Sequence, residues 1–379
     1  MKIVYCVGSL IGKGGMEKVL ANKVNYFVGK MGYEVHIVTQ EQKGLPLCYE
    51  FDEKVVFHDV EISKLNKRII KGYTFIKNIF ALRKIYNTLF DKIQPDIIIV
   101  CERGYNDFVI PFTNKNIPKI REFHFAKEAV KIHASLMPPK SRFKHLLVYK
   151  FLFKMFNKYD YLVLLTNRDK ENGNYKTKTE VIANMNESVV PKETASLENK
   201  NVITVGSMHD DRKRFDVQIN LWKEVVKKYP EWKLNIYGGG AGKEKLQNLI
   251  DQLNLNENVI LHGNSHIMAK HYLDASIFLF TSTAEGLPMV LIEALSYGIP
   301  CVSFDCPTGP SDIITNEVDG YVVEDGNIES LKEKLFKLME ESELRKTMGN
   351  KAKKNAERYT TENIGKQWVS LFRKIKNDK

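Results

Sequence analysis

The stretch that decides the fold is residues 1–39, MKIVYCVGSLIGKGGMEKVLANKVNYFVGKMGYEVHIVT. It opens with Lys2–Gly8, a short run rich in apolar and β-branched residues that ends in glycine, which predicts a buried strand. A glycine-containing loop and a helical segment follow, and Glu34–Thr39 predicts a second strand. This order of strand, loop, helix and strand is typical of a doubly wound parallel sheet.

The same order of elements begins again in the second half of the chain. Asn201–Gly206 (NVITVG) predicts a new first strand, and helical segments alternate with short apolar runs after it. The other predicted strands of the two halves are Pro95–Cys101, Lys119–Phe123, Tyr161–Leu165, Glu180–Ala183, Lys233–Tyr237, Asn258–His262, Ser276–Phe280 and Pro300–Phe304. A chain of 379 residues has the length of two such domains.

The predicted fold class is α/β, with two Rossmann-like, doubly wound parallel-sheet domains facing each other across a cleft. Residues 184–200 are polar and poor in strand formers, so we expect the linker there. Residues 1–190 then form the first domain and residues 191–357 the second. Residues 358–379 are expected to form a helix that packs back on the first domain.

The net charge of +11 is unevenly distributed. Through residue 190 there are 31 Lys and Arg against 19 Asp and Glu, whereas the remainder has 26 against 27. Two stretches, Ser63–Phe90 and Ala129–Tyr159, contain no acidic residue and interleave basic with apolar residues at roughly helical spacing. They predict an amino-terminal domain that contacts an anionic membrane surface. Core-packing helices with solvated basic backs would show the same apolar stripe.

Several other classes of protein are disfavoured by composition. No zinc-finger or RNA-recognition motif accompanies the positive charge, so we expect no nucleic-acid partner. No run of about 18 uncharged apolar residues exists, which argues against a membrane-spanning helix. Five cysteines are scattered without metal-ligand spacing, so we expect no metal and buried thiols in a reducing cytoplasm. They are Cys6, Cys48, Cys101, Cys301 and Cys306.

The strongest functional signal is Ala284–Pro310, AEGLPMVLIEALSYGIPCVSFDCPTGP. Glu285 follows a predicted strand, Pro288 suits the first turn of a helix, and Glu293 lies within that helix. The amides at the start of the helix suit an anion, and the two carboxylates suit sugar hydroxyls. A solvated helix face is the alternative, which Gly286, Pro288 and the apolar spacers disfavour.

This segment resembles the E-G-x-P-x-x-x-x-E signature of retaining glycosyltransferases of the GT-B fold, family 4 (glycosyl transferases group 1), and the likeness spans nearly the whole chain. The resemblance implies that Glu285 contacts the donor sugar and that Glu293 contacts the nucleotide ribose. The backbone from Gly286 to Val290 would meet sugar and phosphate, through Gly286, Leu287, Pro288, Met289 and Val290. Phe304–Pro310 (FDCPTGP) resembles a subset that makes bacterial surface polysaccharides.

A second site is predicted at Val205–Asp216, VGSMHDDRKRFD, between a strand and a helix. Cations at this place can hold a diphosphate. The family has G-R here, followed by a basic residue and a G-F-D helix start. This chain keeps Gly206 but has Ser207 in place of the first Arg and Arg214 in place of Gly. We expect Arg212 and Lys213 to neutralise the leaving phosphate, and whether Arg212 replaces the missing guanidinium is open.

Three more residues complete the predicted site. Gly14 and Gly15 match the amino-terminal G-G-x-E loop of the family, where glycine lets the backbone approach a phosphate closely. A tight turn is the other explanation for this glycine pair. His124 follows a predicted strand at a position where the family keeps a histidine near the reacting sugar, which implies hydrogen bonding to the donor. A lone histidine is otherwise a core or surface residue.

The resemblance implies an enzyme that needs neither cofactor nor metal and that retains anomeric configuration. The expected donor is a UDP-sugar carrying a hexose or N-acetylhexosamine. The expected acceptor is a lipid-diphosphate-linked saccharide or an oligosaccharide in capsular or exopolysaccharide synthesis. We expect a cytoplasmic protein that is peripheral on the inner face of the cell membrane. Two alternatives are a UDP-sugar 2-epimerase on the same fold and a non-catalytic membrane- or polyanion-binding protein.

Overall fold

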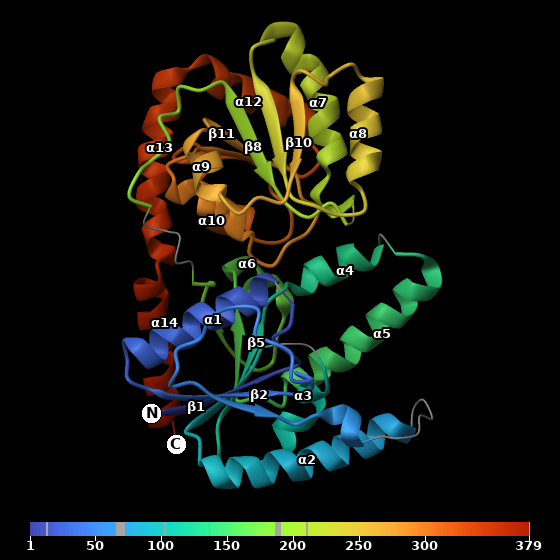
Figure 1. The fold of residues 1–379 in the computed structure, drawn as a ribbon, viewed down its shortest axis with the longest axis vertical. Coiled ribbons are helices and arrows are strands. Elements are labelled where there is room, and N and C mark those ends of the chain that lie inside the picture. The colour runs from blue at the N-terminus through green and yellow to red at the C-terminus, as the bar shows by residue number, and fades with distance from the viewer. Residues whose placement is uncertain are drawn as a thin grey trace. The chain divides into compact units, whose positions relative to one another are not determined.

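A computed structural model describes residues 1–12, 14–65, 73–101, 104–135, 137–185, 191–209 and 211–378 (Figure 1). Within it the chain divides into two compact units. Unit 1 comprises Met1–Met185 and Thr361–Lys379, and unit 2 comprises Asn186–Thr360. Parts of several sequence predictions lie outside the described residues, namely 186–190 of the linker, 66–72 and 136 of the two basic stretches, 210 of the predicted site at 205–216 and 379 of the final helix.

Unit 1 is built on a parallel sheet with the strand order β3-β2-β1-β4-β5-β6-β7. The strands are β1 (Lys2–Val7), β2 (Glu34–Thr39), β3 (Val56–Asp59), β4 (Ile97–Val100), β5 (Lys119–Phe123), β6 (Tyr161–Leu164) and β7 (Lys178–Val181). The helices are α1 (Gly15–Gly29), α2 (Tyr73–Ile93), α3 (Tyr105–Val109), α4 (Lys127–Ser135), α5 (Pro139–Phe156), α6 (Asn167–Gly173) and α14 (Thr361–Asn377), with a 3-10 turn at Ile62–Leu65.

The two faces of this sheet are covered by different helices because alternate residues of a strand point to opposite sides. Ile3 and Tyr5 of β1 pack in one buried cluster with α1 and α14. Val4 and Cys6 pack in another with α2. The helix α14 therefore completes the core of unit 1, although it follows all of unit 2 in the sequence, and Figure 1 shows it beside α1.

Unit 2 repeats the arrangement with the strand order β10-β9-β8-β11-β12-β13, again parallel throughout. The strands are β8 (Asn201–Val205), β9 (Lys233–Tyr237), β10 (Val259–Gly263), β11 (Ile277–Phe280), β12 (Cys301–Phe304) and β13 (Gly320–Val323). The helices are α7 (Phe215–Lys228), α8 (Lys243–Gln252), α9 (Met268–Leu273), α10 (Met289–Ser296), α11 (Pro310–Ile313), α12 (Ile328–Glu340) and α13 (Ser342–Ala356). The 3-10 turn η4 (Asp211–Lys213) precedes α7.

The predicted fold class of two Rossmann-like α/β units with parallel sheets is confirmed. Individual elements differ from prediction. The strands β3 and β13 were not expected, and β7 begins two residues before the predicted Glu180. The final helix begins at Thr361, since residues 357–359 form a separate 3-10 turn. Among the described residues, no helix combines the length and the apolarity needed to cross a membrane.

Candidate functional site

Two of the predicted site residues of unit 2, Lys213 and Glu285, form an ion pair. Lys213 ends the turn η4, and Glu285 lies in the loop between β11 and α10. The Lys213 ammonium nitrogen is 2.7 Å from the Glu285 carboxylate oxygen Oε1, and each side chain is 12% exposed. The two charges, 72 residues apart in the sequence, therefore face each other in a partly buried position.

Backbone contacts hold η4 against the end of β11 and so bring the two charges together. The Thr283 amide donates to the carbonyl of Arg212 at 2.9 Å. The buried Thr281 hydroxyl donates to the carbonyl of Lys213, also at 2.9 Å. This places the half-buried Arg212 next to Lys213 on the same turn. The predicted pair of cations is thus carried by a fixed segment and not by a free loop.

Gly206 determines the path of the Lys213 side chain. A Cβ added at Gly206 would lie 2.9 Å from Cε of Lys213 and 3.0 Å from its Cγ. Its neighbour Ser207, which stands where the family has Arg, is exposed and accepts a hydrogen bond from the amide of His209. The glycine therefore leaves room for the lysine stem along this path, while the serine has a local turn contact.

Arg214 has a structural task that separates it from Arg212 and Lys213. Its φ of 50° is in the left-handed region, where glycine is favoured, which accounts for the family preference at this position. The guanidinium donates to the carbonyls of Thr281 and Ser282 and forms an ion pair with Asp325. Arg214 therefore holds the residues that follow β11.

The loop from Glu285 to Pro288 is held by the FDCPTGP segment. Thr308, which is 1% exposed, donates its hydroxyl to the carbonyl of Gly286 at 2.9 Å and its amide to the carbonyl of Glu285 at 3.2 Å. Gly309 has a φ of 115°, and a Cβ there would lie 2.4 Å from Cδ of Pro288. The sequence motif signalled a subset of the family, but the supporting role of Thr308 was not predicted.

Glu293 lies inside α10, which begins at Met289 after Pro288 and carries Val290 in its first turn. The Tyr272 hydroxyl of α9 donates to Oε2 of Glu293 at 2.9 Å. Burial and the charge of Glu293 raise the pKa of Tyr272 well above its ordinary value, so the phenol remains a donor. Tyr272 also stacks on Tyr297 at 5.2 Å, which fixes its ring and through it one oxygen of Glu293.

In unit 1 the predicted glycines lie where β1 leads into α1. Gly14 is the residue before the helix, and Gly15 opens it. The Glu17 carboxylate folds back over this loop, since a Cβ on Gly14 would lie 2.3 Å from its oxygen Oε2. Gly14 also accepts a hydrogen bond from the Tyr49 hydroxyl at 3.4 Å. Gly14 thus permits a close side-chain contact at the start of the helix, whereas a Cβ on Gly15 would meet no atom within 4 Å.

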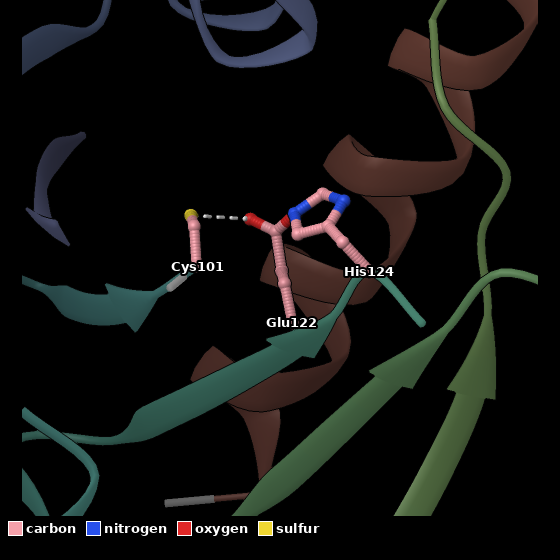
Figure 2. Close-up of side chains that lie close together, drawn as sticks. All are labelled: Cys101, Glu122 and His124. Carbon is pink, nitrogen blue, oxygen red and sulfur yellow. Dashed lines mark hydrogen bonds and ion pairs between the residues drawn. The ribbon is translucent and has the colours of Figure 1, made fainter. Parts of the chain in front are cut away.

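His124 follows β5 and faces a buried carboxylate that the sequence did not single out. Its Nε2 is 3.3 Å from Oε2 of Glu122, and the histidine side chain is 15% exposed (Figure 2). The same carboxylate forms an ion pair with Lys23 of α1. Burial raises the pKa of Glu122, but the charge of Lys23 and the hydrogen bond from His124 outweigh it and lower the pKa to about 2. Glu122 is therefore an anion that orients the His124 ring.

Cys101 completes this cluster and raises the question of a metal. Its thiol donates to Oε1 of Glu122 at 3.4 Å, and ligand atoms of Cys101, Glu122 and His124 all lie within 4.8 Å of one another (Figure 2). These are side chains that can ligate zinc. However, burial and the Glu122 charge raise the pKa of the Cys101 thiol, and the Lys23 ammonium already faces the carboxylate. The cluster is better suited to positioning His124.

Comparison with known proteins gives consistent similarities. Residues 186–355 match the family model "Glycosyl transferases group 1". An uncharacterized glycosyltransferase of Haemophilus influenzae is 29% identical over 381 residues, which cover 98% of this chain and 99% of that protein. The poly(ribitol-phosphate) alpha-N-acetylglucosaminyltransferase of Staphylococcus aureus is 29% identical over 338 residues, 86% of this chain and 67% of that protein.

A solved structure agrees with the two-unit fold. A mutant of TarM from S. aureus, in complex with fondaparinux, alpha-GlcNAc-glycerol and UDP, has a TM-score of 0.74 and 22% sequence identity to this chain. The match covers 98% of this chain and 99% of that one, and it confirms the fold. The chain is a glycosyltransferase, and its residues 186–355 are similar to the glycosyl transferases group 1 family.

Proposed function

We propose that the chain transfers a hexose or N-acetylhexosamine from a UDP-sugar to a saccharide acceptor, with retention of anomeric configuration and without a divalent metal. The observation that carries the proposal is the Lys213–Glu285 ion pair at the carboxyl end of the unit 2 sheet. The nucleotide choice is supported by the UDP in the TarM complex, and the sugar class by the name of the S. aureus relative.

In the proposed reaction the diphosphate binds Lys213, Arg212 and the amides at the start of α10. As the glycosidic bond stretches, negative charge grows on the departing phosphate, where the fixed cations and amides stabilise it. When the diphosphate binds, before the bond stretches, the ammonium of Lys213 exchanges the Glu285 carboxylate for phosphate oxygens. This exchange frees Glu285 to accept hydrogen bonds from the sugar hydroxyls, beside the backbone of Gly286 and Leu287.

Other contacts are assigned by the same reasoning. Glu293 binds the ribose hydroxyls, with Tyr272 fixing one of its oxygens. His124, oriented by Glu122, donates or accepts a hydrogen bond at the donor sugar. Gly14 and Gly15 are assigned to backbone contact with the donor.

Retention follows if the acceptor enters on the face that the phosphate leaves. The acceptor oxygen forms its bond to the anomeric carbon while the bond from that carbon to the phosphate oxygen breaks, and the acceptor proton passes to the phosphate. The alpha linkage in the name of the S. aureus relative supports this stereochemistry, because a UDP-hexose donor is ordinarily an alpha glycoside.

The proposed acceptor is a lipid-diphosphate-linked saccharide used in surface polysaccharide synthesis. The excess of 31 basic over 19 acidic residues through residue 190 supports a peripheral location on the inner face of the cell membrane, where such a substrate is presented.

The test is a screen of radiolabelled UDP-sugars against a pool of lipid-linked acceptors, with and without EDTA. We expect transfer that survives EDTA and is lost in both Lys213→Ala and Glu285→Ala. Transfer that persists in both variants would refute the site assignment. Donor turnover without an acceptor, yielding a 2-epimer, would refute the proposed reaction in favour of an epimerase.

A further inference from the structure

The helix α5 carries positive charge without any negative charge nearby in the sequence. Lys140, Lys144, Lys150 and Lys154 all lie on α5, and residues 129–159 contain no Asp or Glu. All four lysines are exposed. Solvated helices of soluble proteins ordinarily mix both signs, so this helix presents a uniformly cationic surface.

One face of α5 is buried and the opposite face is apolar but exposed. Leu152 and Phe156 pack in a cluster with strands β5 and β6. Phe143 is 71% exposed, Leu147 42% and Phe151 50%. At 100° per residue, positions 143, 147 and 151 share a sector roughly opposite to 152 and 156. Phe143, Leu147 and Phe151 therefore form a second apolar stripe away from the core, and Leu146 and Val148, 39% and 43% exposed, flank it on both sides.

The four lysines lie in the same sector as this second stripe. Helical geometry places positions 140, 144, 150 and 154 within about 60° of Leu147. Long lysine stems can lie beside inserted apolar groups while their ammonium groups reach outward to phosphates. The stripe and the charges thus form one surface, which we call the α5 face: Lys140, Phe143, Lys144, Leu147, Lys150, Phe151 and Lys154.

The α5 face is fixed in its outward orientation by the turn from α4. Arg142, the remaining cation of the helix, donates through Nε to the carbonyl of Ala134 at 3.2 Å and through Nη2 to the carbonyl of Ser135 at 2.6 Å. Arg142 therefore braces the junction of the two helices, and the lysines carry the surface charge.

We propose that the α5 face docks on a bilayer containing anionic phospholipid, with Phe143, Leu147 and Phe151 entering the interface and the four lysines contacting lipid phosphates. Large apolar side chains interspersed with lysines can enter the interface of an anionic membrane while the lysine ammonium groups reach its phosphates. A nucleic acid would satisfy the lysines but would leave the apolar stripe in water. The proposal rests on the peripheral location proposed above and names the surface and the lipid charge that produce it.

The test uses the full-length chain in cosedimentation with vesicles of phosphatidylcholine, with and without phosphatidylglycerol. We expect binding only to the anionic vesicles, weakened by added salt. The triple variant F143S/L147S/F151S should bind at least about ten-fold more weakly, since one buried Leu or Phe side chain contributes more than that factor. The variant K140Q/K144Q/K150Q/K154Q should bind the anionic vesicles about 100-fold more weakly or worse, since each juxtamembrane lysine contributes roughly five-fold to the affinity.

Ile267→Ser is the matched control, because Ile267 is 56% exposed in unit 2 and lies outside the α5 face. It should bind vesicles like the unchanged chain, and thermal unfolding should show that all the variants are folded. Unchanged vesicle binding by the triple variant, or equal binding to neutral and anionic vesicles, would overturn the proposal. So would tight binding to RNA without vesicle binding. Transfer to a soluble acceptor should be unaffected by these variants, which separates this test from that of the reaction.

Discussion

Each unit contains a lysine paired with a glutamate, and the two pairs differ in how they are enclosed. In unit 1 the Lys23 and Glu122 side chains are 2% and 4% exposed. In unit 2 the Lys213 and Glu285 side chains are each 12% exposed. The first pair joins a helix to the centre of a sheet, whereas the second joins a short turn to a loop.

The surroundings of the lysines explain this difference. The Lys23 ammonium lies 4.5 Å from the ring centroid of Trp368 in α14 and 5.4 Å from that of Tyr5 in β1. These two aromatic rings cover the ammonium group. Lys213 has one such ring, Phe280, at 5.3 Å. A sealed pair fixes structure, including here the orientation of His124, while a less buried pair can exchange its partner for a ligand. We therefore expect the same change of residue to affect folding most in unit 1 and catalysis most in unit 2.

The largest expected effect is on the stability of unit 1. Glu122→Ala leaves the Lys23 ammonium buried without its counter-ion, and this kind of loss costs about 3–5 kcal/mol of unfolding free energy. Urea unfolding of the full chain measures it. The double variant K23M/E122Q, which removes both charges at similar volume, is the control and should lose much less. Equal losses in the single and double variants would show that the charges are not coupled.

Lys213→Ala should give the next largest effect, on transfer more than on folding. Loss of one fixed donor to a developing anion costs about 2.7–4 kcal/mol, or roughly 100- to 1000-fold in kcat. Because both side chains are only 12% exposed, the variant leaves Glu285 partly buried without its counter-ion, so the unfolding free energy should fall too, by less than in Glu122→Ala. Steady-state kinetics and urea unfolding on the same preparation separate the two. A folding defect as large as that of Glu122→Ala would remove the contrast between the pairs.

Thr308→Val sharpens the assignment of the loop that carries Glu285. The substitution keeps the volume but leaves the buried Gly286 carbonyl without the hydroxyl donor, at a cost of about 1–3 kcal/mol. We expect weaker donor binding, seen as a raised KM for the UDP-sugar, with the fold retained. Ser303→Ala, a buried hydroxyl on β12 bonded to the carbonyl of Phe304, is the comparison. If both variants raise KM equally, Thr308 has no special role.

The smallest effect is the change with pH of the unfolding free energy that the Lys23–Glu122 pair contributes. The pKa of Glu122 is about 2 in the folded chain against an ordinary value of 4.5, so its contribution to stability is present above pH 4.5 and is lost as pH falls toward 2. The difference in unfolding free energy between the unchanged chain and Glu122→Gln should therefore shrink over that range. A difference that stays constant down to pH 2 would contradict the lowered pKa.

The sequence predicted the fold well because buried parallel strands are short apolar runs. Strand β3, VFHD, escaped prediction because half of its residues are polar and it lies at the edge of its sheet. Strand β13, GYVV, begins with glycine directly after a turn and lies at the edge of its sheet, so its pattern gave little signal. The final helix was placed too early because residues 357–359 continue a helical pattern before the chain turns at Thr360.

The site was predicted in part, and the limits have physical causes. Motif spacing identified Lys213 and Glu285, but their pairing depends on hydrogen bonds from Thr281 and Thr283 that no local pattern reveals. Glu122 and Lys23 were missed because charged residues are ordinarily exposed. A signal for Lys23 did exist, since helical spacing places it next to the buried stripe of Leu20, Val24 and Phe27 in α1.

The most direct test of the central claim is the affinity of the folded chain for UDP and for uridine, measured by calorimetric competition in the unchanged protein and in Lys213→Ala. If Lys213 holds the diphosphate, the variant should bind UDP at least about ten-fold more weakly, since a hydrogen bond to a charged group contributes about 1.5–3 kcal/mol. Its affinity for uridine, which has no phosphate, should be unchanged. Equal UDP affinity in the two proteins would contradict the account.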